Sequence, residues 1–197
     1  MRIRTLTGVL ALSAGYLLLP VPQSLADALS HSISGIVTRV DHAGKKLYVK
    51  SADGTEHVFD TSKGATVRAA GSMGHHTEDA AIDSDKALKQ GSHVVVHYTK
   101  KGAGETASKV DDFGHATVKE TRATVLDVDK GAHTLKVKTD DGAIETYHVA
   151  SDASVDTKDG IKDFATDTSE TTQKGAHVVL HFTQEAGGKV VHTIEKV

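Results

Sequence analysis

The feature that most constrains this 197-residue chain is an internal repeat. At an offset of 88 residues the chain repeats Val37, Val40, Asp41, Leu47, Val49, Lys50, Asp53, Gly54 and Val67, and Tyr147 stands opposite Phe59. Further along, at an offset of 84, it repeats Gly91, His93, Val94, Val95, His97 and Thr99. The change of offset indicates four extra residues in the first copy, between about 68 and 90. Such a repeat predicts two folding units of one kind.

Each copy has the sequence pattern of β-structure. Apolar and polar residues alternate in KLYVKS (46–51) and TLKVKT (134–139), as in half-buried strands. An Asp-Gly pair follows each of them and favours a tight hairpin turn. HVVVHYT and HVVLHFT are rich in β-branched residues, and Gly-containing turns lead from them into last strands at 105–112 and 189–196. Short helical turns are expected around 84–90 and 158–165.

About five short strands in each copy predict a barrel, because closure removes the exposed edges of a small sheet. The predicted fold is therefore all-β, with two tandem five-stranded barrels at residues 33–113 and 120–197. The segment 112–120 is the expected junction. Units of this size bury only a modest share of their surface, so we expect the barrels to pack together.

The first residues have the pattern of an export signal. Arg2 and Arg4 precede an apolar stretch at 6–19, and two prolines and Ser24-Leu25-Ala26 follow it. This order predicts a signal peptide at residues 1–26, cleaved near Ala26. A membrane anchor is the weaker alternative, because the stretch is shorter than the roughly 20 apolar residues that span a bilayer. The mature chain is therefore expected to be periplasmic or secreted, with no membrane span.

The order of elements resembles exported bacterial OB-fold-like domains of unknown function, the family numbered 5666 among such domains. The resemblance rests on GIVTRVD (35–41), the Asp-Gly hairpin, K-x-G-x-x-V-x-V (89–96) and a closing strand that ends at Val110. In the second copy Ala123 replaces Gly35, while Lys174-Gly175 and Ile194 keep the pattern. The resemblance implies OB-like barrels and an extracytoplasmic location, and it brings no catalytic residues.

Composition excludes several classes of function. The chain has no cysteine, so it has neither disulfides nor a lipid-anchored N-terminus. Its net charge of -3 becomes -5 when the two arginines of the signal peptide are removed, which gives nucleic acid no basic face to bind. No nucleophile elbow, phosphate-binding loop or paired catalytic acids can be identified, so we predict a protein that is not an enzyme and needs no cofactor.

The 13 histidines make metal binding the main alternative. His93/His97 and His177/His181 are four residues apart, but the valines between them favour strands. On a strand each pair is about 13–14 Å apart, too far to share one ion. We therefore expect these histidines on the outer face of the barrels or between them. His75 and His76, beside Met73, Glu78 and Asp79, are the better candidate ligands, for Cu, Zn or Ni.

Three further patterns have ordinary interpretations. Asp152, Ser154, Asp156 and Asp163 have the spacing of a calcium loop, but Thr157 stands where that loop needs glycine, and we expect a solvated acidic face instead. GAGETA at 102–107 has the glycines of a nucleotide-binding turn but joins two strands, so it is a hairpin. Tyr48 alone resembles an exposed stacking residue, and the other aromatic residues of the repeat belong to the core.

These observations predict a non-catalytic binding or structural module of the bacterial envelope, with an unknown envelope or extracellular ligand or protein as its partner. Recognition would use the barrel faces or the groove between the barrels. The alternative function is a periplasmic metal-binding protein that uses His75, His76 and the histidines of the outer strands.

Overall fold

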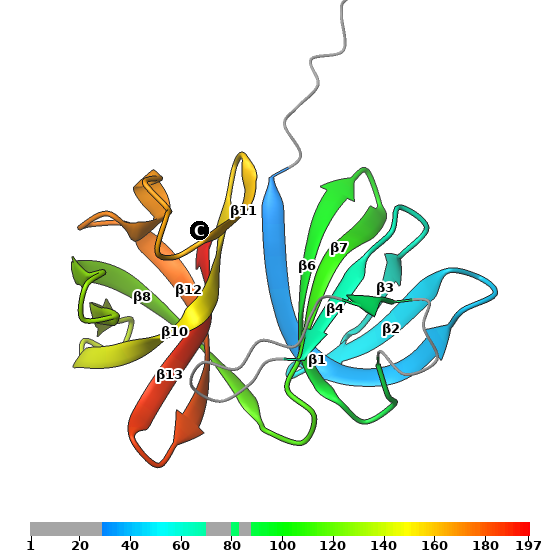
Figure 1. Ribbon diagram of the computed structural model, residues 1–197, viewed down its shortest axis with the longest axis horizontal. Coiled ribbons are helices and arrows are strands. Elements are labelled where there is room, and N and C mark those ends of the chain that lie inside the picture. Colours follow the sequence, from blue (N-terminus) through cyan, green and yellow to red (C-terminus); the bar gives the residue numbers. More distant parts are fainter. Residues whose placement is uncertain (1–28, 70–79, 83–87) are drawn as a thin grey trace, which may run out of the picture.

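The computed structural model describes residues 29–69, 80–82 and 88–197. Within these residues the chain forms two β-sheets that lie side by side, which confirms the all-β, two-barrel fold (Figure 1). The first sheet holds β1 (Ser30–Asp41), β2 (Lys46–Ser51), β3 (Glu56–Asp60), β4 (Thr66–Ala69), β5 (Ala80–Ala81), β6 (His93–Lys101) and β7 (Gly104–Asp112). The second sheet holds β8 (Val118–Asp129), β9 (Thr134–Thr139), β10 (Ile144–Thr157), β11 (Gly160–Asp163), β12 (His177–Glu185) and β13 (Gly188–Lys196). The predicted signal peptide (1–26) lies outside the described residues.

The second sheet closes into a five-stranded barrel. Its ring runs β8, β9, β10, β13, β12 and back to β8, and the β10–β13 pair is parallel. The first sheet repeats this order as β1, β2, β3, β7, β6 and back to β1. Counted within each copy, both rings have the strand order 1-2-3-5-4, a closed Greek-key arrangement of the OB type.

The third strand differs between the two barrels. In the second barrel β10 is continuous, with a register shift between Val149 and Ser154. In the first barrel the matching chain is divided into β3 and β4, both of which pair in parallel with β7. The interruption at 61–65 contains Gly64, whose φ of +83° favours glycine, and no residue of the second barrel interrupts β10 in this way.

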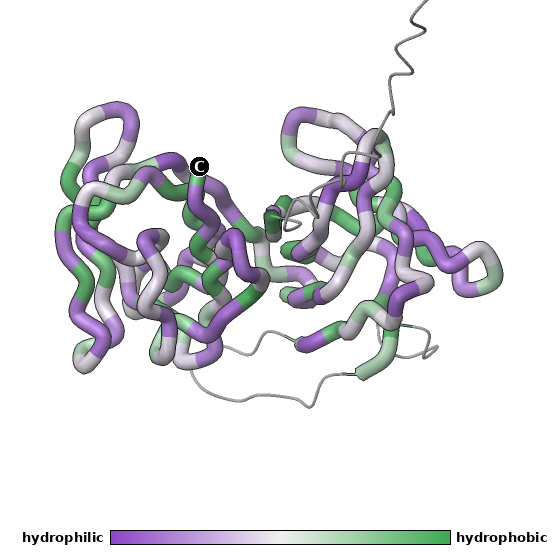
Figure 2. Tube along the Cα trace, turned by 90° about the horizontal axis from the view of Figure 1, so that it is seen from above, coloured by the Kyte–Doolittle hydropathy of each residue, from purple (hydrophilic) through white to green (hydrophobic). Residues whose placement is uncertain are grey.

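Each barrel is filled by the apolar face of its strands. Leu47, Val49 and Phe59 in the first barrel, and Leu135 and Val137 in the second, are fully buried. Tyr98, Tyr147 and Phe182 are buried too, as the alternation of the sequence predicts. Figure 2 shows the trace as two lobes, with hydrophobic and hydrophilic residues mixed along the strands of both. Two separate clusters of apolar residues therefore form two cores.

Two details of the sequence-based expectation are wrong. The segment 158–165 is not a helical turn, because Gly160–Asp163 forms β11, which pairs with the end of β10. A short 3-10 turn, η1, occurs instead at Glu170–Thr172. The acidic run is a solvated face only in part, since Asp152 and Asp156 are buried while Asp163 is exposed. In the described part of the chain, no helix has the length and apolar character of a membrane span.

Candidate functional site

The two barrels meet along β1, which faces the second barrel in Figure 1. Its first half carries serines at alternate positions, so Ser30, Ser32 and Ser34 share one face of the strand and are buried. Each hydroxyl donates a hydrogen bond to a carboxylate of the other barrel. The acceptors are Asp156 for Ser30, Glu195 at 3.0 Å for Ser32, and Glu120 at 3.3 Å for Ser34. Small hydroxyl side chains thus allow close approach of the barrels and still donate to the carboxylates that face them.

His97 of β6 is completely buried at the centre of this interface. Its Nε2 lies 3.0 Å from Asp111 of its own barrel, and its Nδ1 lies 2.8 Å from Asp156 of the other. Burial by itself lowers the pKa of His97, but the charge of Asp156 and the hydrogen bonds to both carboxylates outweigh it and raise the pKa to about 9. At neutral pH His97 is therefore an imidazolium that links the two barrels.

Further charges surround this imidazolium and balance it. Arg68 Nε lies 3.0 Å from Asp111, and its Nη1 lies 3.5 Å from Asp152 of the second barrel. Lys109 reaches Asp111 at 3.3 Å and donates a hydrogen bond of 2.7 Å to Ser154 across the interface. Burial raises the pKa of Asp111, but the hydrogen bond from His97 and the neighbouring positive charges hold it well below its usual range. Cations and carboxylates thus alternate through the interface.

His181 of β12 is equally buried but has different partners. Its Nε2 lies 3.1 Å from the hydroxyl of Ser32, which in turn donates to Glu195. Because the only hydroxyl proton of Ser32 is used, His181 carries its own proton on Nε2 and has a lone pair on Nδ1. Burial and the nearby charge of His97 lower the pKa of His181 to about 4, and Asp156 opposes them. His181 is therefore neutral at physiological pH.

A cavity of about 620 Å³ opens between the barrels, above these buried groups. The first barrel contributes Leu29 and the 31–34 and 51–53 segments, and the second contributes Glu120, Arg122, Val179 and the 195–197 segment. We call this cavity the inter-barrel groove. Burial raises the pKa of Glu195, although hydrogen bonds from Ser32 and His31 oppose the change. The groove therefore offers hydrogen-bond donors and acceptors from both barrels.

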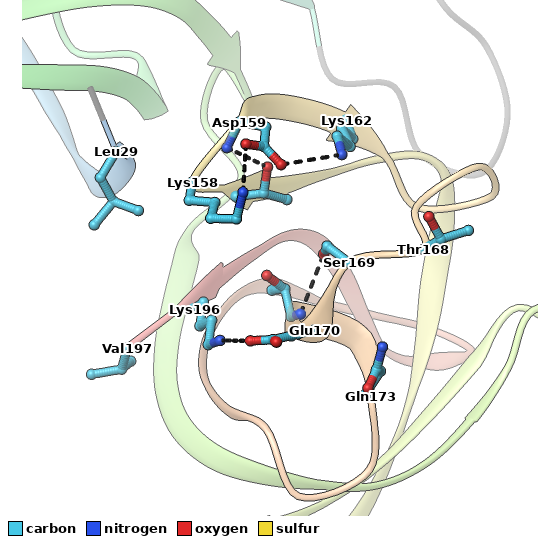
Figure 3. A pocket seen from close by; sticks show the side chains of 12 residues that line it. Leu29, Lys158, Asp159, Lys162, Thr168, Ser169, Glu170, Gln173, Lys196 and Val197 are labelled. Carbon is cyan, nitrogen blue, oxygen red and sulfur yellow. Dashed lines mark hydrogen bonds and ion pairs between the residues drawn. The ribbon is translucent and has the colours of Figure 1, made fainter. Parts of the chain in front are cut away.

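A second cavity of about 570 Å³ lies beside the groove and shares Leu29, Lys196 and Val197 with it. Figure 3 shows its polar lining, where Lys196 pairs with Glu170 at 2.7 Å and Lys158 with Asp159 at 2.8 Å. Its charged groups thus pair with one another across the wall of the cavity. The inter-barrel groove, which both barrels build, is the better candidate site.

The residues that the sequence marked for metal binding lie only in part within the described structure. His75 and His76 lie outside the described residues. His93 and His97 occupy one strand, as do His177 and His181, which confirms the predicted strand geometry. Of these four histidines, His97 and His181 contact side chains of the other barrel, while His177 is exposed. Within residues 29–69, 80–82 and 88–197, no group of three or more histidine or acidic side chains is placed to hold a metal ion.

The other marked residues have structural roles. Asp152, Ser154 and Asp156 lie along β10 with Asp163 paired opposite Ser154, so they form no calcium loop. Residues 102–107 join β6 to β7 as the predicted hairpin. Tyr48 is covered by the guanidinium of Arg39, which lies 3.8 Å from the centre of the ring. Neither the calcium nor the nucleotide interpretation therefore has a site.

Sequence reasoning missed the interface serines and their acidic partners. The signal was present as S-x-S-x-S at 30–34, a run of small hydroxyl residues on one face of a strand where core residues are expected. The second copy has V-x-E-x-R at the same positions, 118–122, which shows that this face is not the repeated core.

Comparison with known families found no match, and no curated protein matches the chain. Among solved structures, two of CusF are similar in part. The Ag(I) form aligns with 41% of this chain and 99% of its own, at 12% identity and a TM-score of 0.33. The apo form from Escherichia coli, residues 6–88, aligns with 42% of this chain and 89% of its own, at 12% identity and a TM-score of 0.32.

Proposed function

We propose that the protein is an exported, non-catalytic binding module that holds its ligand in the inter-barrel groove. The observation that carries this proposal is the buried network around His97, which ties two complete barrels together and fixes the groove between them. A groove that is rigid before binding costs little ordering entropy when a ligand enters it. Its volume of about 620 Å³ falls in the range of small-molecule sites.

The proposal is tested with isotopically labelled mature protein, residues 27–197. A defined set of sugars, amino acids, polyamines, dicarboxylates and nucleotides is titrated, and the perturbed backbone amides are mapped by NMR. We expect at least one compound to perturb residues 31–34 and 195–197 in a saturable way. Arg122→Ala, at the groove, should change the affinity of that compound, whereas Arg39→Ala, which removes an exposed arginine of the first barrel, should not. Perturbations that gather elsewhere, or none at all, would reject the groove.

Two parts of this function have their own tests. Export predicts that the secreted or periplasmic protein begins near Asp27, which mass spectrometry of the mature chain measures. Absence of catalysis predicts no turnover of model ester, phosphate and glycoside substrates above the buffer rate. A rate that depends on protein concentration would contradict it.

The second candidate function is metal binding through His75 and His76, supported by the composition of their segment. Calorimetric titration of the mature protein with Zn, Cu and Ni tests it. A stoichiometric, sub-micromolar event that disappears in the double variant His75→Ala/His76→Ala would support the metal function. Weak uptake that the double variant does not change would leave the groove as the site.

A further inference from the structure

His181 leaves a hydrogen-bond acceptor unused beneath the groove. Its Nε2 is taken by Ser32, and its Nδ1 is a buried atom with no hydrogen-bond partner in the described part of the molecule. The side chain is completely buried, so the free lone pair has lost its hydration. Leaving such an atom unpaired costs free energy, because its hydrogen bond to water is lost and nothing replaces it. A group that pairs with Nδ1 therefore has a free-energy advantage at this point of the molecule.

A carboxylate lies next to this acceptor. Glu120 Oε2 is 3.8 Å from His181 Nδ1, and the Glu120 side chain is 43% exposed and lines the groove. Two atoms that both accept hydrogen bonds face each other here, and neither can donate to the other. The hydroxyl of Ser34 lies 3.3 Å from the same carboxylate oxygen and adds a third atom that can accept a hydrogen bond. A group with several hydrogen-bond donors would therefore pair with all of these acceptors at once.

A second unpaired atom lies on the neighbouring strand. Thr193 pairs with His181 across β12 and β13, is completely buried, and its hydroxyl also lacks a partner among the described residues. In the first barrel the equivalent residue is Lys109, which pairs with His97 in register and reaches Asp111. The first barrel therefore carries an ammonium group of its own where the second has only a hydroxyl.

We infer that the groove binds a ligand through a primary ammonium group, held between the Glu120 carboxylate and Nδ1 of His181. This inference rests on the proposed function and names the chemistry of its ligand. A tetrahedral ammonium has three N–H donors, which suit Nδ1, the carboxylate and the hydroxyl of Ser34. Its charge pairs with Glu120 in a groove where Asp53, Glu120 and Glu195 outnumber Arg122 and Lys196. A structural zinc ion needs four ligands, whereas this point offers one imidazole nitrogen and one carboxylate.

The site has a built-in comparison, because His97 holds the same position in the first barrel. Both nitrogens of His97 are occupied by carboxylates, so that imidazole offers nothing to a ligand. Binding should therefore perturb the ring of His181 and leave the ring of His97 unchanged. Glu120 is half-exposed, so its rotation admits the ammonium without disturbing the barrel cores.

The test follows both imidazole rings by NMR in the mature protein. The probes are 1,5-diaminopentane and glucosamine, with 1,5-pentanediol and glucose as matched compounds that lack the amine. We expect saturable shifts of the His181 ring nitrogens with the amines only. Glu120→Gln should weaken the binding about tenfold, as loss of a charge-assisted hydrogen bond does. Glu56→Gln, which changes an exposed glutamate of the first barrel, should alter it less than twofold.

Four outcomes would overturn the inference. Two concern the ring nitrogens of His181: shifts with the alcohols equal to those with the amines, or no shift with the amines. The third is an equal loss of affinity in Glu120→Gln and Glu56→Gln. The fourth is a shift of the His181 ring nitrogens with Zn²⁺ and not with the amines. If a compound without an amine occupies the groove while the amines do not, the ammonium inference fails and the proposed function stands. If no compound of either kind enters the groove, both fail.

Discussion

His97 and His181 occupy the same position in the two copies, 84 residues apart, and both are completely buried where the barrels meet. Their chemistry is nevertheless opposite, since His97 is protonated at neutral pH and His181 is not. The difference comes from their partners, since His97 lies between Asp156 of the other barrel and Asp111 of its own, whereas His181 contacts the hydroxyl of Ser32. The same residue at the same position of two similar strands therefore acquires its charge from its partners.

The residues around the two histidines have diverged to support this difference. Asp156 stands where the first copy has Arg68, so one copy supplies an anion and the other a cation at the same place. Asp111 and Glu195 are also equivalent, but Asp111 contacts His97 whereas Glu195 accepts from His31 and Ser32.

The largest expected effect comes from removing the two histidines in turn. His97→Leu leaves Asp111 and Asp156 buried without their shared cation and should lower the free energy of unfolding by about 3–5 kcal/mol. His181→Leu removes an unpaired nitrogen along with one hydrogen bond, and it should cost less than about 1.5 kcal/mol. Urea unfolding at pH 7 measures both. Equal losses of unfolding free energy in His97→Leu and His181→Leu would contradict the difference between the two histidines.

The pH dependence of stability should show both histidines, with opposite signs. His97 binds its proton more tightly in the folded state, so its contribution is complete below pH 6.5 and is lost as the pH rises through about 9. His181 binds its proton less tightly when folded, so its contribution is complete above pH 6.5 and is lost as the pH falls through about 4. A pKa shift of one unit corresponds to about 1.4 kcal/mol. Each histidine should therefore change the free energy of unfolding by about 3 kcal/mol over its pH range.

Urea unfolding between pH 4 and 9 measures this curve, and its maximum should lie near pH 6.5. Asp111, Asp156 and Glu195 also titrate on the acid side, so the acid limb of His181 is taken as the difference between wild type and His181→Leu. A stability that rises steadily from pH 7 to 9 would contradict a protonated His97.

The smallest expected effect separates two of the interface serines. Ser32→Ala removes the hydroxyl that joins His181 to Glu195 and should cost about 1 kcal/mol. Ser34→Ala removes only a 3.3 Å bond to the half-exposed Glu120, so it should cost less than about 0.5 kcal/mol. The two variants are compared by urea unfolding in one buffer. The reverse order would show that Ser32 is not the link between the two groups.

Much of the fold follows from local patterns in the sequence. The predicted strands at 46–51 and 134–139 coincide with β2 and β9, because alternation with period two is a local property. The buried aromatics Phe59, Tyr98 and Tyr147 follow from the same rule. The helical turn expected at 158–165 failed because polar residues of a short hairpin carry no period, and the pairing of β11 with β10 decides its conformation.

The interface between the barrels could be predicted from the sequence only in part. Strand alternation placed the histidines on the face away from the core, which left the outer surface or the contact between barrels as their location. Nothing local distinguishes His97 from His181, because their sequence neighbours are nearly the same. Asp156 contacts His97 of the other barrel, which is 59 residues away in the sequence. The residues around Asp156 give no sign of this contact, so the run of acids predicts a solvated face.

The shared imidazolium has a consequence for how the molecule comes apart. Each barrel closes its own ring of strands, yet separating the barrels would expose His97 to water and leave Asp156 without its counterion. Unfolding of either barrel therefore removes the charged partner of a buried group in the other barrel. We expect a single cooperative thermal transition for the whole chain, and an excised half that is much less stable than its complete ring of strands implies.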